Sequence, residues 1–275
     1  MGSTLLRHPA VAGRFYPGDA DELQSEVQAY LAPTDSKDSA PIRAVGCIAP
    51  HAGYIYSGHV AGAVFARIEV PELCIVMCPN HTGIGRALSV MSEGAWETPL
   101  GEVAIHDGFA SALKGRFPAL EEDAAAHRAE HAVEVELPFL QALQPQLRFV
   151  PIALGTGRLE VLEQLGLALA EVIVQHGEPV LMVASSDMNH YESDAVTRVK
   201  DHKAIERILT LDPRGLHEVV TQQDISMCGY GPTVAMLTAA RQLGAKSADL
   251  VKYATSGDVS GDRDMVVGYA GVVIS

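Results

Sequence analysis

Cysteine is scarce in this chain, with four residues among 275, and there is a single tryptophan. Four cysteines are too few to hold a domain of this size together by disulfides, so the fold is expected to depend on a hydrophobic core. Cys47, Cys74 and Cys78 lie inside apolar runs, which predicts buried thiols that act as small hydrophobic side chains. Cys228 lies in the glycine-rich stretch "MCGYGP" and is treated separately below.

Basic residues are also few, because 20 Lys and Arg face 34 Asp and Glu, for a formal net charge of −14. The basic residues are scattered singly, and an acidic surface repels phosphate backbones, so we expect no nucleic-acid partner. No apolar run reaches the roughly 20 residues of a membrane helix, and the N-terminus has no signal-peptide pattern. We therefore expect no membrane association and a cytoplasmic protein.

Short apolar, β-branched runs alternate with helical patterns along the chain, which predicts βαβ units. The expected strands are 44–49, 73–78, 147–152, 180–184, 250–254 and 265–274. The expected helices are 20–31, 59–67, 109–114, 130–143, 159–176, 196–209 and 233–243. The pattern predicts a single α/β domain over 1–275 with three layers, a mostly parallel sheet and helices on both faces. The last two strands are expected to form an antiparallel hairpin at one edge, and 33–41 is the one linker-like stretch.

Three of the expected strands are each followed within a few residues by a histidine, in "APH", "CPNH" and "SSDMNH". These histidines are His51, His81 and His190. Ligands of open α/β sheets bind beyond the carboxyl ends of the strands, and parallel strands end at the same edge. The threefold repetition therefore predicts that the three imidazoles meet in one crevice, although a single histidine in such a place is usually an ordinary loop residue.

Cys228 precedes an expected helix that starts near Pro232, and the positive end of a helix dipole lowers the pKa of a thiol. Two histidines and one thiolate make a three-ligand metal site with an open position, whereas the alternative is an inert loop cysteine. Asp187 either orients a histidine or closes a turn. Glu130, His131 and Glu134 are expected on one side of a helix, which either reaches the site or is solvated.

Seven motifs together resemble the Memo family, also described as system protein B of the AmmeMemoRadiSam group. These are "AGRFYP", "APHAGYIYSG", "CPNHTG", "WETPLG", "EHAVEVELPFL", "SSDMNHY" and "MCGYGP", which run from Ala12 almost to the C-terminus. The family is similar in fold to the class III extradiol dioxygenases, which hold non-haem Fe(II) on two histidines and a carboxylate. The resemblance implies the same fold here and a functional link with a radical-SAM protein and an AMMECR-type domain.

By motif, the resemblance implies metal ligation by His51 and His81 and acid/base chemistry at His190, with Cys228 in place of the carboxylate ligand. Fe(II) is the expected metal, with copper or zinc as alternatives. One hypothesis is a metal-dependent redox enzyme in which Asp187 fixes the tautomer of His190, and its substrate is contacted by Tyr54, Tyr230 and His131. The other is a non-catalytic module that binds a peptide, a protein or a metal in transit in the same crevice.

Overall fold

The computed structural model describes residues 5–32 and 40–275, so most of the predicted linker lies outside the described residues. The strands are β1 (Leu6–Arg7), β2 (Gly46–Ala49), β3 (Leu73–Pro79), β4 (Leu88–Val90), β5 (Ala95–Thr98), β6 (Gly101–Ile105), β7 (Glu121–Glu122), β8 (Arg148–Leu154), β9 (Val180–Ser185), β10 (His190–Glu192), β11 (Ala248–Thr255) and β12 (Val266–Ile274). The helices are α1 (Ala20–Leu31), α2 (Tyr54–Phe65), α3 (Asp107–Arg116), α4 (Ala124–His127), the 3-10 turn η1 (Glu134–Glu136), α5 (Leu137–Leu143), α6 (Leu159–His176), α7 (Asp194–Leu209), α8 (Pro213–Gln222), α9 (Tyr230–Gln242) and α10 (Ser256–Ser260).

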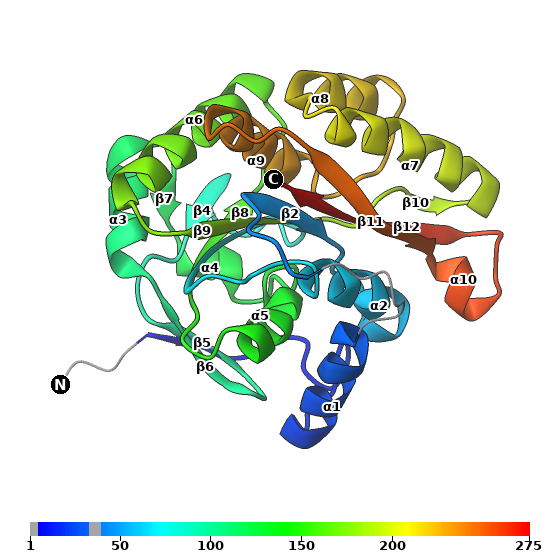
Figure 1. The fold of residues 1–275 in the computed structure, drawn as a ribbon, viewed down its shortest axis with the longest axis horizontal. Helices are drawn as coiled ribbons and strands as arrows, with labels where there is room; N and C mark the ends of the chain where they lie inside the picture. The colour runs from blue at the N-terminus through cyan, green and yellow to red at the C-terminus, as the bar shows by residue number, and fades with distance from the viewer. Residues whose placement is uncertain (1–4, 33–39) are drawn as a thin grey trace.

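The strands of the described chain form one mixed sheet between two layers of helices (Figure 1). At its centre β8, β3, β9 and β2 are parallel neighbours in that order. Antiparallel β12 adds to β2, while β8 pairs with parallel β6 and antiparallel β4. The predicted terminal hairpin is confirmed, because β11 and β12 pair antiparallel and β12 adds to β2. The parallel pairing is typical of βαβ units, because α2 connects β2 to β3 and α6 connects β8 to β9 across a face of the sheet.

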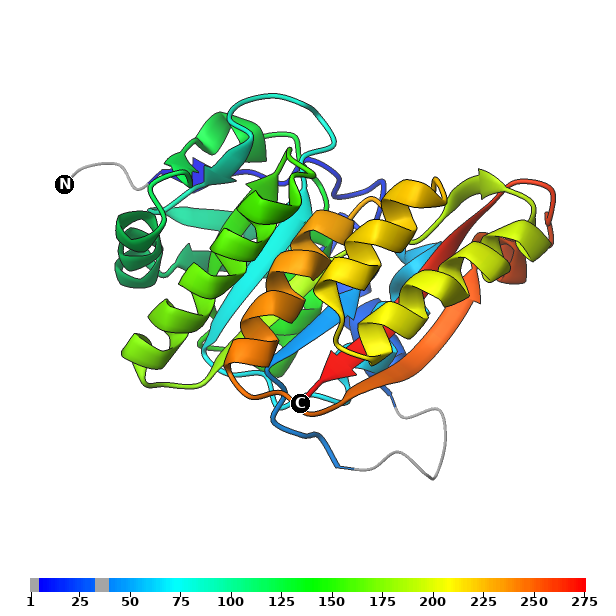
Figure 2. The same ribbon diagram turned by 90° about the horizontal axis from the view of Figure 1, so that it is seen from above.

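The helices cover both faces of the sheet. Helices α3, α6, α9, α8 and α7 pack side by side on one face, as the view from above shows (Figure 2). Helices α1, α2 and α5 pack together on the other face (Figure 1). The predicted fold class, a three-layer α/β arrangement, is therefore confirmed.

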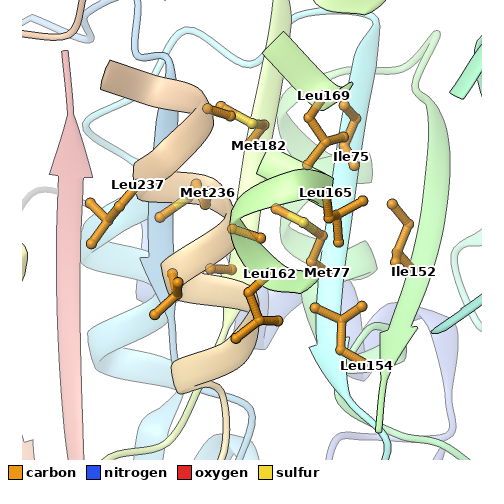
Figure 3. Packing of buried hydrophobic residues seen from close by; sticks show 14 of the residues in the cluster. Ile75, Met77, Ile152, Leu154, Leu162, Leu165, Leu169, Met182, Met236 and Leu237 are labelled. Carbon is orange, nitrogen blue, oxygen red and sulfur yellow. The ribbon is translucent and has the colours of Figure 1, made fainter. Parts of the chain in front are cut away.

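Alternate side chains of the central strands supply two separate cores, as the two-residue period of a strand requires. Ile75 and Met77 face α6 and α9, where Leu165 and Met236 pack against them (Figure 3). The cysteines Cys47, Cys74 and Cys78 point to the opposite face and are fully buried, as predicted. Among the described helices, none combines the length and the apolar character that a bilayer crossing needs.

Several elements differ from the sequence prediction. The helix expected over 130–143 begins only at Glu134, because residues 130–133 form a bend whose Glu130 side chain accepts the backbone N–H of Ala132. Helix α8 was not predicted, although Asp212 caps it and Pro213 starts it, both of which are typical helix-start signals. The short strands β1, β4, β5, β6, β7 and β10 were also missed, since two to five residues carry little periodicity.

The buried ring of His127, at the end of α4, gives the fold a pH dependence. Burial, reinforced by the charge of Arg7, lowers the pKa of His127 from 6.5 to about 4. Between these values the unfolded chain binds more protons than the folded chain, so stability is lost as the pH falls. The ring packs edge-on against Trp96, so phenylalanine should fit in its place.

We expect the His127→Phe variant to lose less stability than the parent as the pH falls from 6.5 towards 4. The difference between their free energies of unfolding should shift in favour of the variant by up to about 1.4 kcal/mol per pH unit. Urea unfolding followed by circular dichroism at several pH values measures this difference. Parallel pH curves for the two proteins would contradict the expectation.

Candidate metal centre

Three predicted metal ligands converge at the carboxyl edge of the sheet. β2 ends at Ala49 and β3 at Pro79, in each case two residues before a histidine. The ligand atoms of His51, His81 and Cys228 all lie within 4.8 Å of one another. The sequence predicted this meeting because parallel strands end at the same edge of a sheet. In the structure β2 and β3 are both parallel to β9, which lies between them. The arrangement offers two imidazole nitrogens and one sulfur to a single ion.

Cys228 comes from the loop before α9, and its Sγ lies 3.3 Å from Nε2 of His51. The loop approaches the end of β9 so closely that a Cβ on Gly229 would lie 2.4 Å from the carbonyl oxygen of Ser185, so only glycine fits there. Burial, with the charge of Asp187 second, raises the pKa of the Cys228 thiol. The expectation that the helix dipole lowers this pKa is therefore wrong, because desolvation outweighs the dipole. A thiolate at this position needs a cation beside it.

His51 is 2% exposed and therefore almost completely removed from water. Burial lowers its pKa well below the usual value, and the neighbouring His131 and His81 lower it further. The neutral imidazole that results is the form that binds metals. The Nδ1 atom of His51 lies 2.8 Å from Oγ of Ser185, while Nε2 faces Cys228.

His81 is held by the completely buried side chain of Glu130. The Nδ1 atom of His81 lies 2.9 Å from Oε1 of Glu130, and the backbone N–H of His81 donates to Oε2 at 2.6 Å. Burial alone would raise the pKa of Glu130, but the hydrogen bond and charge of His81, together with the Ala132 N–H and the charge of His131, outweigh burial and lower it. An ionised carboxylate only accepts, so Nδ1 of His81 carries the proton and Nε2 is free as a ligand atom.

His190 lies beside the Cys228 loop. Its backbone N–H donates to Oγ of Ser226 at 2.8 Å, and its Nδ1 lies 2.9 Å from the Ser226 carbonyl oxygen. Because a carbonyl oxygen only accepts, Nδ1 of His190 carries the proton and Nε2 is the basic nitrogen. The sequence suggested that Asp187 fixes this tautomer. In the structure the Ser226 carbonyl oxygen is the group that accepts the Nδ1 proton of His190.

Asp187 lies on the turn after β9, and its Oδ1 accepts the backbone N–H of His51 at 2.9 Å. Burial raises the pKa of Asp187 to about 6, while the neighbouring His190 and the backbone N–H groups of His51 and Ala52 act in the opposite direction. Asp187 thus holds the main chain of a ligand loop, and no imidazole is its hydrogen-bond partner among the described residues.

The three residues predicted to contact a substrate lie in different surroundings. His131 stacks on His81 with ring centroids 4.8 Å apart, so it borders the candidate centre. Tyr230 starts α9 and packs near Gly157, in the loop beyond β8. Tyr54 is 2% exposed and its hydroxyl donates to the Val135 carbonyl, so its position in the core does not support a substrate contact.

A second group, His81, Glu130 and His131, also has ligand atoms within 4.8 Å of one another. Its carboxylate is already used, because Glu130 accepts from the side chain and the backbone of His81 and from the backbone of Ala132. In the group of His51, His81 and Cys228 no ligand atom accepts several hydrogen bonds in this way, so this group is the stronger candidate for a cation site.

Glu130 was expected on a helix face that either reaches the site or is solvated, without a role as a support of His81, and Ser185 and Ser226 were not identified from the sequence. The signal for the first was present, since "EHAVEVE" places three acids in an otherwise apolar stretch. An acid in such a stretch is buried only when a partner satisfies it. The serines carried no comparable signal, because serine is common in turns after strands.

The fold and the clustered ligands define an α/β protein with a candidate metal centre at the carboxyl edge of its sheet. Over residues 7–273 the chain matches the family described as Memo-like protein. MEMO1 family proteins of Methanopyrus kandleri and Ignicoccus hospitalis are 43% and 44% identical over 279 residues, which covers 98% of this chain and 99% and 98% of theirs. The chain therefore belongs to the Memo-like family.

Among solved structures, an uncharacterised protein from Escherichia coli K12 is similar, with a TM-score of 0.59. It is 13% identical, and the match covers 84% of this chain and 100% of that chain. At this identity the similarity concerns the fold, and it agrees with the three-layer architecture.

The contacts of Glu130 lead to a test of the candidate centre. In a Glu130→Gln variant the support of His81 loses its negative charge, so we expect affinity for Zn²⁺ to fall by about 10–100-fold. Competition titration against a chromogenic chelator measures the affinity, and thermal unfolding checks that the variant is folded. Glu121→Gln, which changes an exposed acid on β7, is the control and should bind like the parent. Equal affinities in all three proteins would show that Glu130 only supports the loop.

Proposed function

We propose that this protein binds a transition-metal ion on His51, His81 and Cys228. The observation that carries the proposal is the grouping of three ligand atoms within 4.8 Å of one another, at the edge of the sheet where α/β proteins bind ligands. Both histidines are oriented so that Nε2 is available. Such support of ligand histidines by a second layer of hydrogen bonds is typical of metal sites.

The donor set narrows the choice of metal. Imidazole suits iron, copper and zinc, whereas a thiolate favours zinc and copper(I) over magnesium or calcium. We propose Fe(II) as the metal, with copper or zinc as the alternatives. Two imidazoles and one thiolate leave a position open for an exogenous ligand, as a catalytic site needs and a closed structural site lacks.

As the first candidate function we propose a metal-dependent redox enzyme of unknown substrate. A bound iron or copper ion would supply one-electron chemistry and polarise an oxygen ligand. His190 would move a proton through its Nε2 atom, since its Nδ1 proton is committed to the Ser226 carbonyl. His131 and Tyr230 would border the substrate.

A second candidate function is a binding or metal-handling module that holds a peptide, a protein partner or a metal ion in the crevice. The observation that favours it is Cys228, because a thiolate beside iron and oxygen is itself oxidisable. Metal analysis of protein purified without a metal-affinity tag, followed by oxygen uptake with catechols, separates the two. Uptake that requires the bound metal supports the enzyme, and metal binding without uptake supports the module.

The proposed metal centre predicts a specific effect of losing the thiol. A serine hydroxyl is a poor ligand at neutral pH, so Cys228→Ser should bind Zn²⁺ at least about 10-fold more weakly than the parent. Cys74→Ser, which makes the same change in a buried strand, should bind like the parent once thermal unfolding shows that it is folded. Equal affinities in the three proteins would mean that Cys228 is no ligand.

A further inference from the structure

The side chain of Ser185, at the end of β9, has three close partners although its hydroxyl carries one hydrogen. Its Oγ lies 2.6 Å from the Ala132 carbonyl oxygen, 2.8 Å from Nδ1 of His51 and 2.8 Å from Oε1 of Glu136. Ser185, Ala132 and Glu136 are completely buried. The proton positions in this cluster follow from counting donors and acceptors.

The Ala132 carbonyl can only accept, and two oxygens 2.6 Å apart require a hydrogen between them. The single hydrogen of Ser185 is therefore committed to Ala132. The other two contacts of Oγ must then be accepted by Ser185, so Nδ1 of His51 donates one and the carboxyl group of Glu136 donates the other. Burial raises the pKa of Glu136 well above its usual value, in agreement with a protonated carboxyl group.

We infer that Ser185 and Glu136 form a buried, uncharged hydrogen-bonded pair that positions His51 with its Nε2 atom directed at Cys228. The inference rests on the proposed metal site and adds its positioning residues on the His51 side. Ser185 contacts the metal-ligand residue His51 directly, and Glu136 fixes the direction of the Ser185 hydroxyl. On the other side of the centre, His81 is held by an ionised carboxylate.

A purely structural role for Glu136 explains the contacts less well. Its Oε2 atom has no hydrogen-bond partner among the described residues, which makes it a poor choice for filling a core. A leucine or methionine at this position would leave no polar atom unsatisfied. Glu136 is explained if it acts on Ser185, because the donation of its proton keeps the Ser185 hydroxyl turned to Ala132 and its lone pair turned to His51.

The first test reads the proton on His51 directly and needs no metal. Long-range ¹H–¹⁵N correlation spectra of protein labelled with ¹⁵N-histidine distinguish the two imidazole tautomers. We expect His51, assigned through a His51→Gln variant, to be neutral and protonated on Nδ1. Infrared difference spectra of the parent against Glu136→Gln should show a protonated carboxyl band that is lost in the variant. A His51 protonated on Nε2, or an ionised Glu136, would overturn the inference.

The second test asks whether the pair matters for Zn²⁺ binding, measured by competition titration. Ser185→Ala should lose about 10–100-fold in affinity, whereas Ser185→Thr, which keeps the hydroxyl, should lose much less. Glu136→Gln can still donate an N–H to Ser185 and should stay within about threefold of the parent, whereas Glu136→Leu should fall further. Ser89→Ala removes another buried serine hydroxyl, on β4, and is the control.

The outcomes separate this inference from the proposed function. A parent protein that binds no Zn²⁺, Fe²⁺ or copper would defeat the metal site but leave the tautomer of His51 to be read by NMR. A parent that binds Zn²⁺ with a Ser185→Ala variant of equal affinity would defeat the positioning role alone. If Ser185→Thr is unfolded by its extra methyl group, the Ala variant and the two Glu136 variants still decide.

Discussion

The buried carboxylate of Glu134 is the point on which the candidate site depends. It forms an ion pair with the buried guanidinium of Arg7 and accepts hydrogen bonds from the backbone N–H groups of Ala10 and Val11 and from the hydroxyl of Tyr16. Leaving one of these buried charges unpaired would destabilise the fold by about 3–5 kcal/mol. The N-terminal segment and the segment 130–136, which carries Glu134, are therefore fixed to each other. The same arginine lies over the ring of Trp96.

This anchoring has consequences for the candidate metal centre, because the supports of both histidines lie with Glu134 in the segment 130–136. Glu130 and Glu136 lie four residues before and two residues after Glu134 and, like it, are completely buried. One reaches His81 directly and the other reaches His51 through Ser185. The four donors that hold Glu134 therefore fix both supports at once, and the loops of His51 and His81, which begin on rigid parallel strands, meet them.

The predictable part of this protein is the part governed by periodicity. The central strands were found because buried parallel strands read as continuous apolar runs, and His51 and His81 were found because they follow two of these runs. Glu130, Ser185 and Ser226 were not recognised as supports, because each acts through a contact between residues far apart in sequence, such as the 49 residues between His81 and Glu130. The helix dipole at Cys228 was recognised, but the desolvation that opposes it depends on how closely the Gly229 loop packs, which no local pattern records.

The electrostatics of the candidate site would favour a bound cation. Burial raises the pKa values of Asp187 and Cys228, and the carboxylate of Asp187 raises that of the thiol further. A cation between the thiol and the two imidazoles would reverse these effects, because its charge favours the deprotonated forms of both acids. Binding of an ion would therefore be coupled to proton release at this site. The uncharged support of His51 agrees with this, because a neutral Glu136 orients the ligand histidine without adding negative charge to a site that already has Asp187 and Glu130.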